Sequence, residues 1–362
     1  MINKRQFLKS ALVAGFATTQ LPIISGAGES GYLKKNKSKK KHWVWINPNP
    51  KDTEEAIQAL YAKYHEAGIR GIFFEGDSEK HFRIAKKNKI EAHRWIWTMN
   101  RGEKSLLEAH PEWYAVNRKG ESCAVKPPYV NYYRWLCPSR EEVYQYLETE
   151  VRAMLNKDYV DGIHLDYVRY CDVILPVNLW ENYSIEQNKE LPEYDYCYCD
   201  VCRAAFKQQK GIDPLTIKHP DQSPSWRKFR YDNITKIVNR LSAVAHTFKK
   251  PITAAVFPTP EVAKRIVRQD WTNWKLDAVC PMIYHGFYKE DVTWIGDAVA
   301  EGVKGIGGKF PLYAGLYIPD FKGEDEVRKG IELAMQNGAA GVSIFGNLSD
   351  KLLDVLKSLK NI

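Results

Sequence analysis

An alternation of strand-like and helix-like segments from residue 42 onward constrains the fold of this chain more than any other feature. Short stretches rich in β-branched and aromatic residues alternate with longer stretches in which apolar residues recur at helical spacing. The expected strands are 42–47, 71–75, 90–97, 161–167, 252–257, 278–284, 312–316 and 341–345. The expected helices are 52–67, 79–88, 139–156, 261–269, 290–302, 324–337 and 350–359. Eight such units in about 320 residues predict an α/β fold, the (β/α)8 or TIM barrel.

An open, doubly wound sheet is the competing architecture. That sheet usually carries a glycine-rich phosphate-binding turn after its first strand, and the Asn-Pro-Asn-Pro sequence at 47–50 is not such a turn. Two long insertions, about 100–138 and 171–224, follow the third and fourth strands on the face where barrels bind their ligands. Long structured loops at that face commonly build a substrate groove. We therefore expect one barrel domain over residues 42–362.

The N-terminal segment has the order of a bacterial export signal. Basic residues precede a modestly apolar run that begins at Ser10, and small residues follow that run. The segment resembles a twin-arginine signal, with Lys4 and Arg5 in place of its two arginines. We expect residues 1–30 to be this signal, 31–41 to be a basic linker, and the protein to be periplasmic or at the cell surface. The apolar run is too short to span a membrane.

The net charge of +9 is concentrated in the same segment. Residues 1–41 contain nine of the 53 Lys and Arg residues and one of the 44 Asp and Glu residues. The remaining 44 basic and 43 acidic residues leave the rest of the chain nearly neutral. Because a nucleic-acid-binding domain usually carries a basic face, no nucleic-acid partner is expected. Nothing in the composition indicates an oligomeric state.

The fourth expected strand ends in a carboxylate, Asp166. The alternation of polar and apolar residues places His164 and Asp166 on one face of this strand. Gly162, near its start, allows a close approach of other groups. A carboxylate at the C-terminal end of a barrel strand is typical of a catalytic or substrate-contacting residue, and the alternative is a cap on the next loop. We predict that Asp166 is catalytic.

Polar and aromatic residues at or near the ends of the strands are candidate substrate contacts. Aromatic rings there stack on sugars or simply fill the core, and polar groups there hydrogen-bond to hydroxyls. An arginine in this set could clamp Asp166 or an acidic substrate, or form an ion pair within its loop. The candidates are Asn47, His93, Trp95, Trp97, His164, Arg169, Tyr284 and His285.

Three cysteines lie within six residues, at Cys197, Cys199 and Cys202. The last two form a C-x-x-C pair, the spacing at which two thiolates share one tetrahedral zinc ion. Cys171 is the best placed along the chain to be a fourth ligand. The pattern resembles the structural zinc site of family 42 β-galactosidases, which implies a structural zinc and no cofactor for catalysis. Disulfides and free thiols are the alternatives, since export exposes thiols to an oxidising compartment.

Motifs spread over most of residues 42–345 resemble, in their order, the bacterial glycosyl-hydrolase-like barrels labelled family-10-like, which are exported proteins. The matching segments are EAHRW at 91–95, HPEW at 110–113, LCPS at 136–139, VDGIHLDY at 160–167, QDW at 269–271 and LDAVCPMIY at 276–284. The fourth-strand motif also resembles the Asp-Gly-x-x-x-Asp strand of the α-amylase superfamily. The last Asp of that motif is a nucleophile, and this resemblance implies the same role for Asp166.

Cleavage of a glycosidic bond requires a second carboxyl group opposite the first. Glu75 stands at the end of the second expected strand. Glu261 follows the fifth strand, where amylase-like barrels hold their acid, but it could instead open a helix, where an acidic residue suits the helix dipole. Asp270 is a third candidate.

The leading expectation is an exported glycoside hydrolase that acts on a polysaccharide or oligosaccharide, with Asp166 as nucleophile or base. One alternative is a catalytically inactive carbohydrate-binding protein on the same barrel. Another is a metal-dependent hydrolase that acts on sugar substituents and has His and Asp residues clustered at the barrel mouth. A second carboxylate roughly 5–10 Å from Asp166 across an open groove would favour the glycosidase.

Overall fold

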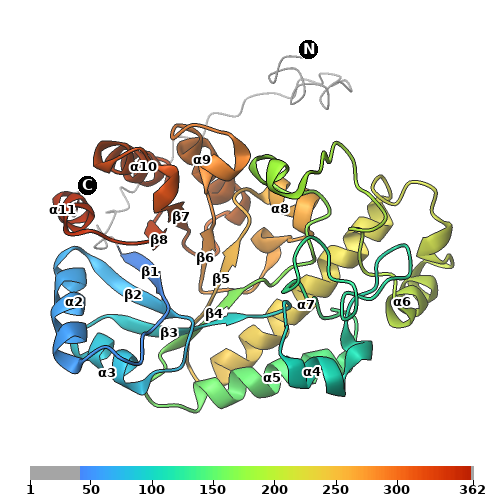
Figure 1. Cartoon of the computed structure of the whole chain (residues 1–362), viewed down its shortest axis with the longest axis horizontal. Helices are drawn as coiled ribbons and strands as arrows, with labels where there is room; N and C mark the ends of the chain where they lie inside the picture. The colour runs from blue at the N-terminus through green and yellow to red at the C-terminus, as the bar shows by residue number, and fades with distance from the viewer. Residues whose placement is uncertain (1–40, 360–362) are drawn as a thin grey trace, which may run out of the picture. The chain divides into compact units, whose positions relative to one another are not determined.

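Eight parallel strands form a nearly closed barrel within residues 41–359, the part of the chain that the computed structural model describes (Figure 1). The strands are β1 (His42–Ile46), β2 (Ile69–Phe74), β3 (Glu91–Trp97), β4 (Gly162–Asp166), β5 (Ile252–Val256), β6 (Ala278–Pro281), β7 (Tyr313–Tyr317) and β8 (Gly341–Phe345). They pair in the order β6-β5-β4-β3-β2-β1-β8-β7. Bridges from Val279 to Leu312 and from Met282 to Gly315 join β6 to β7. The predicted TIM barrel is confirmed, whereas the expected export signal and nearly all of the linker lie outside the described residues.

Helices follow the strands and lie on the outside of the barrel (Figure 1). They are α2 (Glu54–Glu66), α3 (Glu79–Lys87), α5 (Glu141–Leu155), α7 (Pro224–Thr247), α8 (Pro260–Val267), α9 (Trp294–Ile306), α10 (Glu324–Gln336) and α11 (Asp350–Ser358). Most of them match the expected segments to within a few residues. The exception is α7, a helix of 24 residues that was not predicted. Its signals were present in the sequence, because Ser223 caps it, Pro224 opens it and its buried residues recur at helical spacing.

The interior of the barrel is filled largely by aromatic side chains. The inward-facing cluster consists of Trp43, Trp45, Phe73, Trp95, Ala255, Ala278, Cys280 and Tyr313. A larger apolar core lies between the sheet and the helices. Gly162 makes room for the interior packing, because a Cβ there would lie 2.7 Å from Cε1 of His93 and 2.7 Å from the carbonyl oxygen of Pro251.

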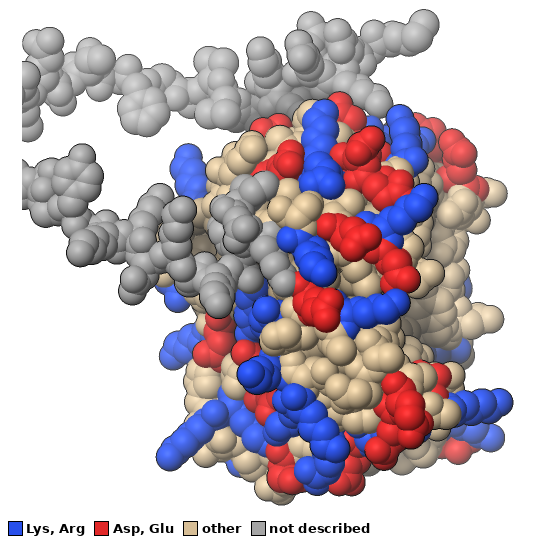
Figure 2. All heavy atoms as spheres, turned by 90° about the vertical axis from the view of Figure 1, so that its left-hand side faces the viewer, with Lys and Arg blue, Asp and Glu red and all other residues tan. Residues whose placement is uncertain are grey.

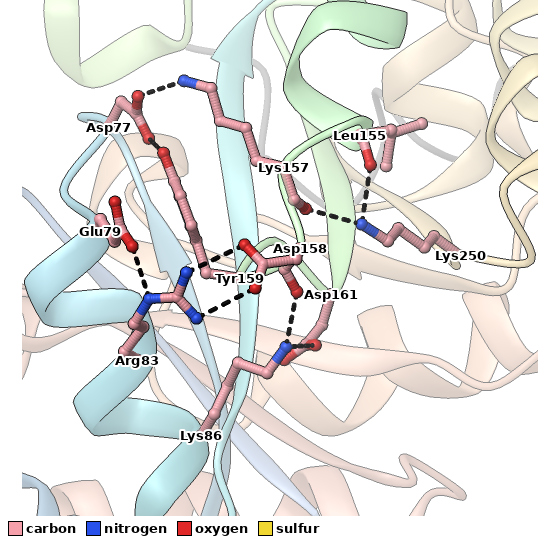
Figure 3. A network of polar contacts seen from close by, with 10 residues as sticks. All are labelled: Asp77, Glu79, Arg83, Lys86, Leu155, Lys157, Asp158, Tyr159, Asp161 and Lys250. Atoms are coloured by element: carbon pink, nitrogen blue, oxygen red, sulfur yellow. Dashed lines mark hydrogen bonds and ion pairs between the residues drawn. The ribbon is translucent and has the colours of Figure 1, made fainter.

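A polar network holds the loop between α5 and β4 and so fixes the start of β4 (Figure 3). Lys86 Nζ contacts Asp161 Oδ1 at 2.8 Å, and Asp161 Oδ2 accepts a hydrogen bond of 3.0 Å from the backbone N–H of Ala92. Arg83, also on α3, binds the same loop through two further hydrogen bonds. The first aspartate of the fourth-strand motif is therefore structural, and it anchors the strand that ends in Asp166.

The two insertions pack against each other. The first insertion, residues 98–140, lies between β3 and α5 and contains α4 (Lys104–Ala109). The second insertion, residues 167–223, lies between β4 and α7 and contains α6 (Asp200–Lys210). A bridge pairs Asn117 with Tyr196, and the N–H of Tyr198 donates a hydrogen bond of 2.7 Å to the carbonyl of Val116.

The surface of the barrel carries charges of both signs. On the face shown in Figure 2, Lys and Arg side chains are interleaved with Asp and Glu side chains. This mixture agrees with the near-neutral charge of the chain after its first 41 residues. Among residues 41–359, no helix has both the length and the apolar character needed to cross a membrane.

Candidate active site

A cavity of about 490 Å³ opens at the C-terminal ends of the strands, between the strand ends and the second insertion. Most of the candidates predicted from the sequence line it: Asn47, Glu75, Trp95, Trp97, Asp166, Arg169 and Tyr284. The cavity also has lining residues that were not predicted, among them Trp45, Tyr133, Asp172, Phe287, Tyr288 and Phe345. Trp45 and Phe345 could have been found from the inward alternation of their strands. The others lie in loops, where no periodic signal marks them.

Asp166 lies at the end of β4 with both carboxylate oxygens hydrogen-bonded. Oδ1 accepts a hydrogen bond of 2.6 Å from the N–H of Tyr167, and Oδ2 accepts one of 3.1 Å from Nε1 of Trp95. Burial raises the pKa of Asp166 to about 6, even though these two hydrogen bonds and the charge of Arg169 lower it. A carboxyl group with this pKa changes its protonation near neutral pH, which suits acid–base chemistry.

Glu75 follows β2 and faces the same cavity as Asp166. Both backbone polar groups of Glu75 are hydrogen-bonded. Its N–H donates a hydrogen bond of 3.0 Å to the carbonyl of Ile46, and the guanidinium of Arg94 binds its carbonyl oxygen. The negative charge of Glu75 is one of the causes that raise the pKa of Asp166. The two carboxylates therefore interact electrostatically, and Glu75 is the candidate partner of Asp166.

Arg169 and Asp172 form a buried ion pair in the cavity wall. Arg169 Nη1 lies 2.8 Å from Asp172 Oδ2, and the two side chains are 6% and 3% exposed. The guanidinium also lies over the rings of Trp135, at 4.7 Å, and Phe257, at 4.9 Å. Its charge is thus paired within its own loop.

The three predicted histidines do not line the cavity. His164 lies beneath it, where Trp45 Nε1 donates a hydrogen bond of 3.0 Å to Nε2 and Thr253 Oγ1 lies 2.8 Å from Nδ1. An indole N–H can only donate, so Nε2 is unprotonated and the proton is on Nδ1. Burial lowers the pKa of His164 well below its usual value, so the ring is neutral. His93 and His285 are also buried, and these three candidates are corrected from substrate contacts to packing residues.

Aromatic rings make up much of the remaining cavity surface. Tyr284 and Phe345 are nearly parallel, with an interplanar angle of 14° and centroids 6.3 Å apart. On the other side, Trp97 lies against Tyr167 with centroids 4.7 Å apart. Flat aromatic faces beside hydrogen-bonding groups are suited to binding sugar rings.

Two of the candidate acids lie away from the cavity. Glu261 is exposed in the first turn of α8, where Thr259 caps the helix and the N–H of Glu261 donates a hydrogen bond of 3.1 Å to Glu301 Oε1. Glu261 therefore opens a helix, which is the alternative that the sequence left open. Because it does not line the cavity, its assignment as the acid is corrected. Asp270 is paired with Lys264 at 2.8 Å and does not line the cavity either.

The cysteine cluster has a different fourth member from the one expected. Cys137, Cys197, Cys199 and Cys202 converge, with all four sulfur atoms within 4.8 Å of one another. Cys171 is buried outside this group, with its sulfur directed to the carbonyl of Asp172, so the structure places Cys137, and not Cys171, beside the other three. These four cysteines form the one group of three or more potential metal ligands found within residues 41–359, so no His and Asp cluster was found at the mouth of the described barrel.

The carboxylates of Asp166 and Glu75 thus line a cavity at the mouth of the barrel, where barrel enzymes hold their substrates. The family model "Glycosyl hydrolase-like 10" matches residues 80–301. That range covers more than half of the chain, and the chain belongs to this family. It includes Asp166 and all four clustered cysteines but not Glu75. In a comparison with curated protein sequences, no significant match was found.

Solved structures of glycoside hydrolases share the fold. The glycoside hydrolase domain of PgaB (BpsB) from Bordetella bronchiseptica has a TM-score of 0.64 at 10% identity, with 89% of this chain and 98% of that chain covered. The catalytic domain of a β-amylase from Paenibacillus polymyxa has a TM-score of 0.60 at 13% identity, with 88% and 97% covered. A β-galactosidase from Marinomonas ef1 has a TM-score of 0.61 at 11% identity, with 89% of this chain and 59% of that chain covered.

Proposed function

We propose that the protein is a glycosidase in which Asp166 acts as nucleophile or base and Glu75 acts as the acid. The observation that carries this proposal is that both carboxylates line one cavity at the mouth of the barrel and interact electrostatically. Membership of a glycosyl hydrolase-like family supports it. The shared fold with a β-amylase and a β-galactosidase also agrees with it.

In the proposed reaction, Glu75 donates a proton to the glycosidic oxygen as the bond to the anomeric carbon breaks. Asp166 either attacks the anomeric carbon or takes a proton from the water that does so. In both routes one water is consumed and its hydroxyl ends on the anomeric carbon. The proton of the water goes to Glu75 when Asp166 is the nucleophile, and to Asp166 when Asp166 is the base; in the second case exchange with solvent restores both carboxyl groups. The two donors to Asp166, Trp95 and the backbone of Tyr167, stabilise the ionised form that either role needs.

The charges around the cavity favour a neutral or positively charged sugar as substrate. Glu75, Asp166 and Asp172 contribute three carboxylates, and Arg169 is the one cationic side chain among the lining residues. Because Arg169 is already paired with Asp172, it leaves no free positive charge for a uronic acid or a sulfated sugar. Burying an unpaired anion beside Asp166 and Glu75 would be unfavourable.

The activity is tested by incubating the purified protein with a panel of neutral, amino and acidic polysaccharides and measuring released reducing ends. We expect turnover on a neutral or amino polymer and its loss by about 10²–10⁴-fold in Asp166→Asn and Glu75→Gln. Glu261→Gln is the matched control, because this carboxylate is exposed on α8, and it should keep wild-type activity. Binding of a polymer without any turnover would overturn the proposal in favour of a carbohydrate-binding protein.

We further propose that the protein acts outside the cytoplasm, on the evidence of its N-terminal residues. Lys4 and Arg5 precede an apolar run and then small residues, the order of an export signal. Mass spectrometry of the protein from the periplasmic fraction should show an N-terminus near residue 30. Recovery of the protein from the cytoplasm alone, with Met1 retained, would contradict export.

A further inference from the structure

Four buried cysteine side chains meet where the two insertions pack together. Cys137 comes from the first insertion, and Cys197, Cys199 and Cys202 come from the second. Cys137 Sγ lies 3.2 Å from Cys197 Sγ, 3.3 Å from Cys199 Sγ and 3.4 Å from Cys202 Sγ. Cys197 Sγ lies 3.7 Å from Cys199 Sγ and 2.9 Å from Cys202 Sγ.

These separations fit a shared metal ion better than disulfides. A disulfide requires two sulfur atoms at about 2.05 Å, and all five of these sulfur separations are larger than that. Four sulfur atoms at about 2.3 Å from one tetrahedral zinc ion stand about 3.8 Å apart. The observed spacing approaches that value, and all four sulfur atoms lie within 4.8 Å of one another.

A guanidinium group and a helix N-terminus lie beside the cluster. A zinc ion with four thiolates carries a formal charge of about −2, which needs nearby compensation. Arg140 interacts electrostatically with Cys137, Cys197 and Cys199, and its buried Nε–H has no hydrogen-bond partner, while its Nη2 binds the exposed carboxylate of Asp200 at 2.7 Å. Cys199 is the N-cap residue of α6, where the helix dipole stabilises negative charge.

A buried polar network supports the cysteine-bearing segment. Arg230 of α7 is fully buried and binds the carboxylate of Asp195. Asp195 Oδ2 also accepts a hydrogen bond of 2.6 Å from the hydroxyl of Tyr198, and Trp226 Nε1 donates one of 3.0 Å to that hydroxyl. This network fixes the residues next to Cys197 and Cys199 in the chain, Tyr196 and Tyr198.

We propose that Cys137, Cys197, Cys199 and Cys202 bind one zinc ion that joins the two insertions and so steadies the cavity wall. The first insertion contributes Tyr133 to that wall and the second contributes Asp172, Leu175 and Leu179 among others. None of the four cysteines lines the cavity. Because four protein ligands fill the coordination of zinc, the site has a structural and not a catalytic role.

The proposal is tested first by metal analysis of the full chain, purified from zinc-supplemented medium without chelator. We expect one zinc per chain in the wild type, in Cys171→Ser and in Cys123→Ser, because those two thiols lie outside the cluster. Cys137→Ser and Cys202→Ser should lose most of the zinc and melt at lower temperature. Equal zinc loss in Cys171→Ser and Cys137→Ser would overturn the ligand assignment.

A second measurement does not depend on the folding of any variant. Wild-type protein reloaded with Co²⁺ should show the strong visible and sulfur-to-cobalt absorption bands of a tetrahedral tetrathiolate. Removal of the metal should also increase proteolytic cleavage within residues 167–223. Absence of the bands, stoichiometric iron in place of zinc, or a disulfide among the four cysteines found by mass spectrometry would overturn the proposal. None of these readouts uses glycosidase activity, so this proposal and the proposed function can fail separately.

Discussion

The indole of Trp95 donates a hydrogen bond of 3.1 Å to Oδ2 of Asp166, so a residue of β3 helps to set the protonation of the carboxylate at the end of β4. Trp95→Phe removes this donor and should raise the pKa of Asp166 further, because the bond stabilises the ionised form. The acid limb of kcat/KM against pH should move to higher pH. Trp97→Phe is the control, since Trp97 Nε1 has no hydrogen-bond partner to lose. An equal shift in both variants would contradict this role of Trp95.

The pH dependence of the wild type tests the role of Asp166 itself. Burial raises the pKa of Asp166 to about 6. A nucleophile or base must be ionised, so kcat/KM should rise with pH through about 6. A profile that instead falls through pH 6 would identify Asp166 as the proton donor and Glu75 as its partner in the opposite role.

The free energy of unfolding should also depend on the protonation of Asp166. The pKa of Asp166 in the folded state, about 6, lies above its ordinary value of 3.8. The folded state therefore binds more protons between these values, and the free energy of unfolding should fall as pH rises from about 4 to 6. Allowing for partial exposure to solvent, we expect a fall of about 1–2 kcal/mol. Denaturant unfolding at several pH values should show this fall in the wild type, and the same contribution should be missing in Asp166→Asn.

The assignment of Glu75 as the acid predicts a dependence on the leaving group. Glu75→Gln should strongly slow the hydrolysis of natural glycosides, whose leaving alcohol needs a proton. It should have much less effect on aryl glycosides with acidic phenols, which leave without one. Steady-state rates on both substrate types would measure this difference. If Glu75→Gln slowed both types equally, Glu75 would not be the proton donor.

The ion pair of Arg169 and Asp172 should be a determinant of stability. Asp172→Ala leaves a buried guanidinium without its carboxylate, which should lower the free energy of unfolding by about 3–5 kcal/mol. Removing the exposed partner of a surface pair, as in Asp232→Ala, should change it by less than about 1 kcal/mol. Chemical denaturation of the two variants tests the contrast, and similar losses would show that the buried pair contributes little.

Gly162 provides a test of the packing inside the barrel. Gly162→Ala places a Cβ 2.7 Å from the His93 ring and from a backbone oxygen that cannot easily move, so it should destabilise the fold by about 1–3 kcal/mol. Gly102→Ala is a matched control, because its Cβ would meet no atom closer than 3.8 Å. Thermal melts should separate the two variants, and a neutral Gly162→Ala would mean that the His93 ring and the Pro251 carbonyl can both move away from β4.

The barrel was predictable from the sequence because the spacing of apolar residues within each segment indicates whether that segment is a strand or a helix. Each strand and nearly every helix carries its own pattern of apolar residues, and eight repeats leave few other architectures. The same alternation placed Asp166, Trp95 and Trp97 on inward faces at the strand ends, and the structure finds all three at the cavity. The sequence also holds local signals for α7, in the cap at Ser223 and the proline at its first position.

Only the tertiary structure decided which residues meet across the loops. Cys137 lies 60 residues before Cys197 along the chain, and no local pattern relates them; the packing of the two insertions brings their sulfurs to 3.2 Å. Glu261 follows β5 along the chain, as a catalytic acid at a strand end would. In the structure it lies in the first turn of α8, which Thr259 caps, and it does not line the cavity. Local periodicity sets each element, whereas the pairing of loop residues depends on how separate elements pack, and one-dimensional spacing does not contain that information.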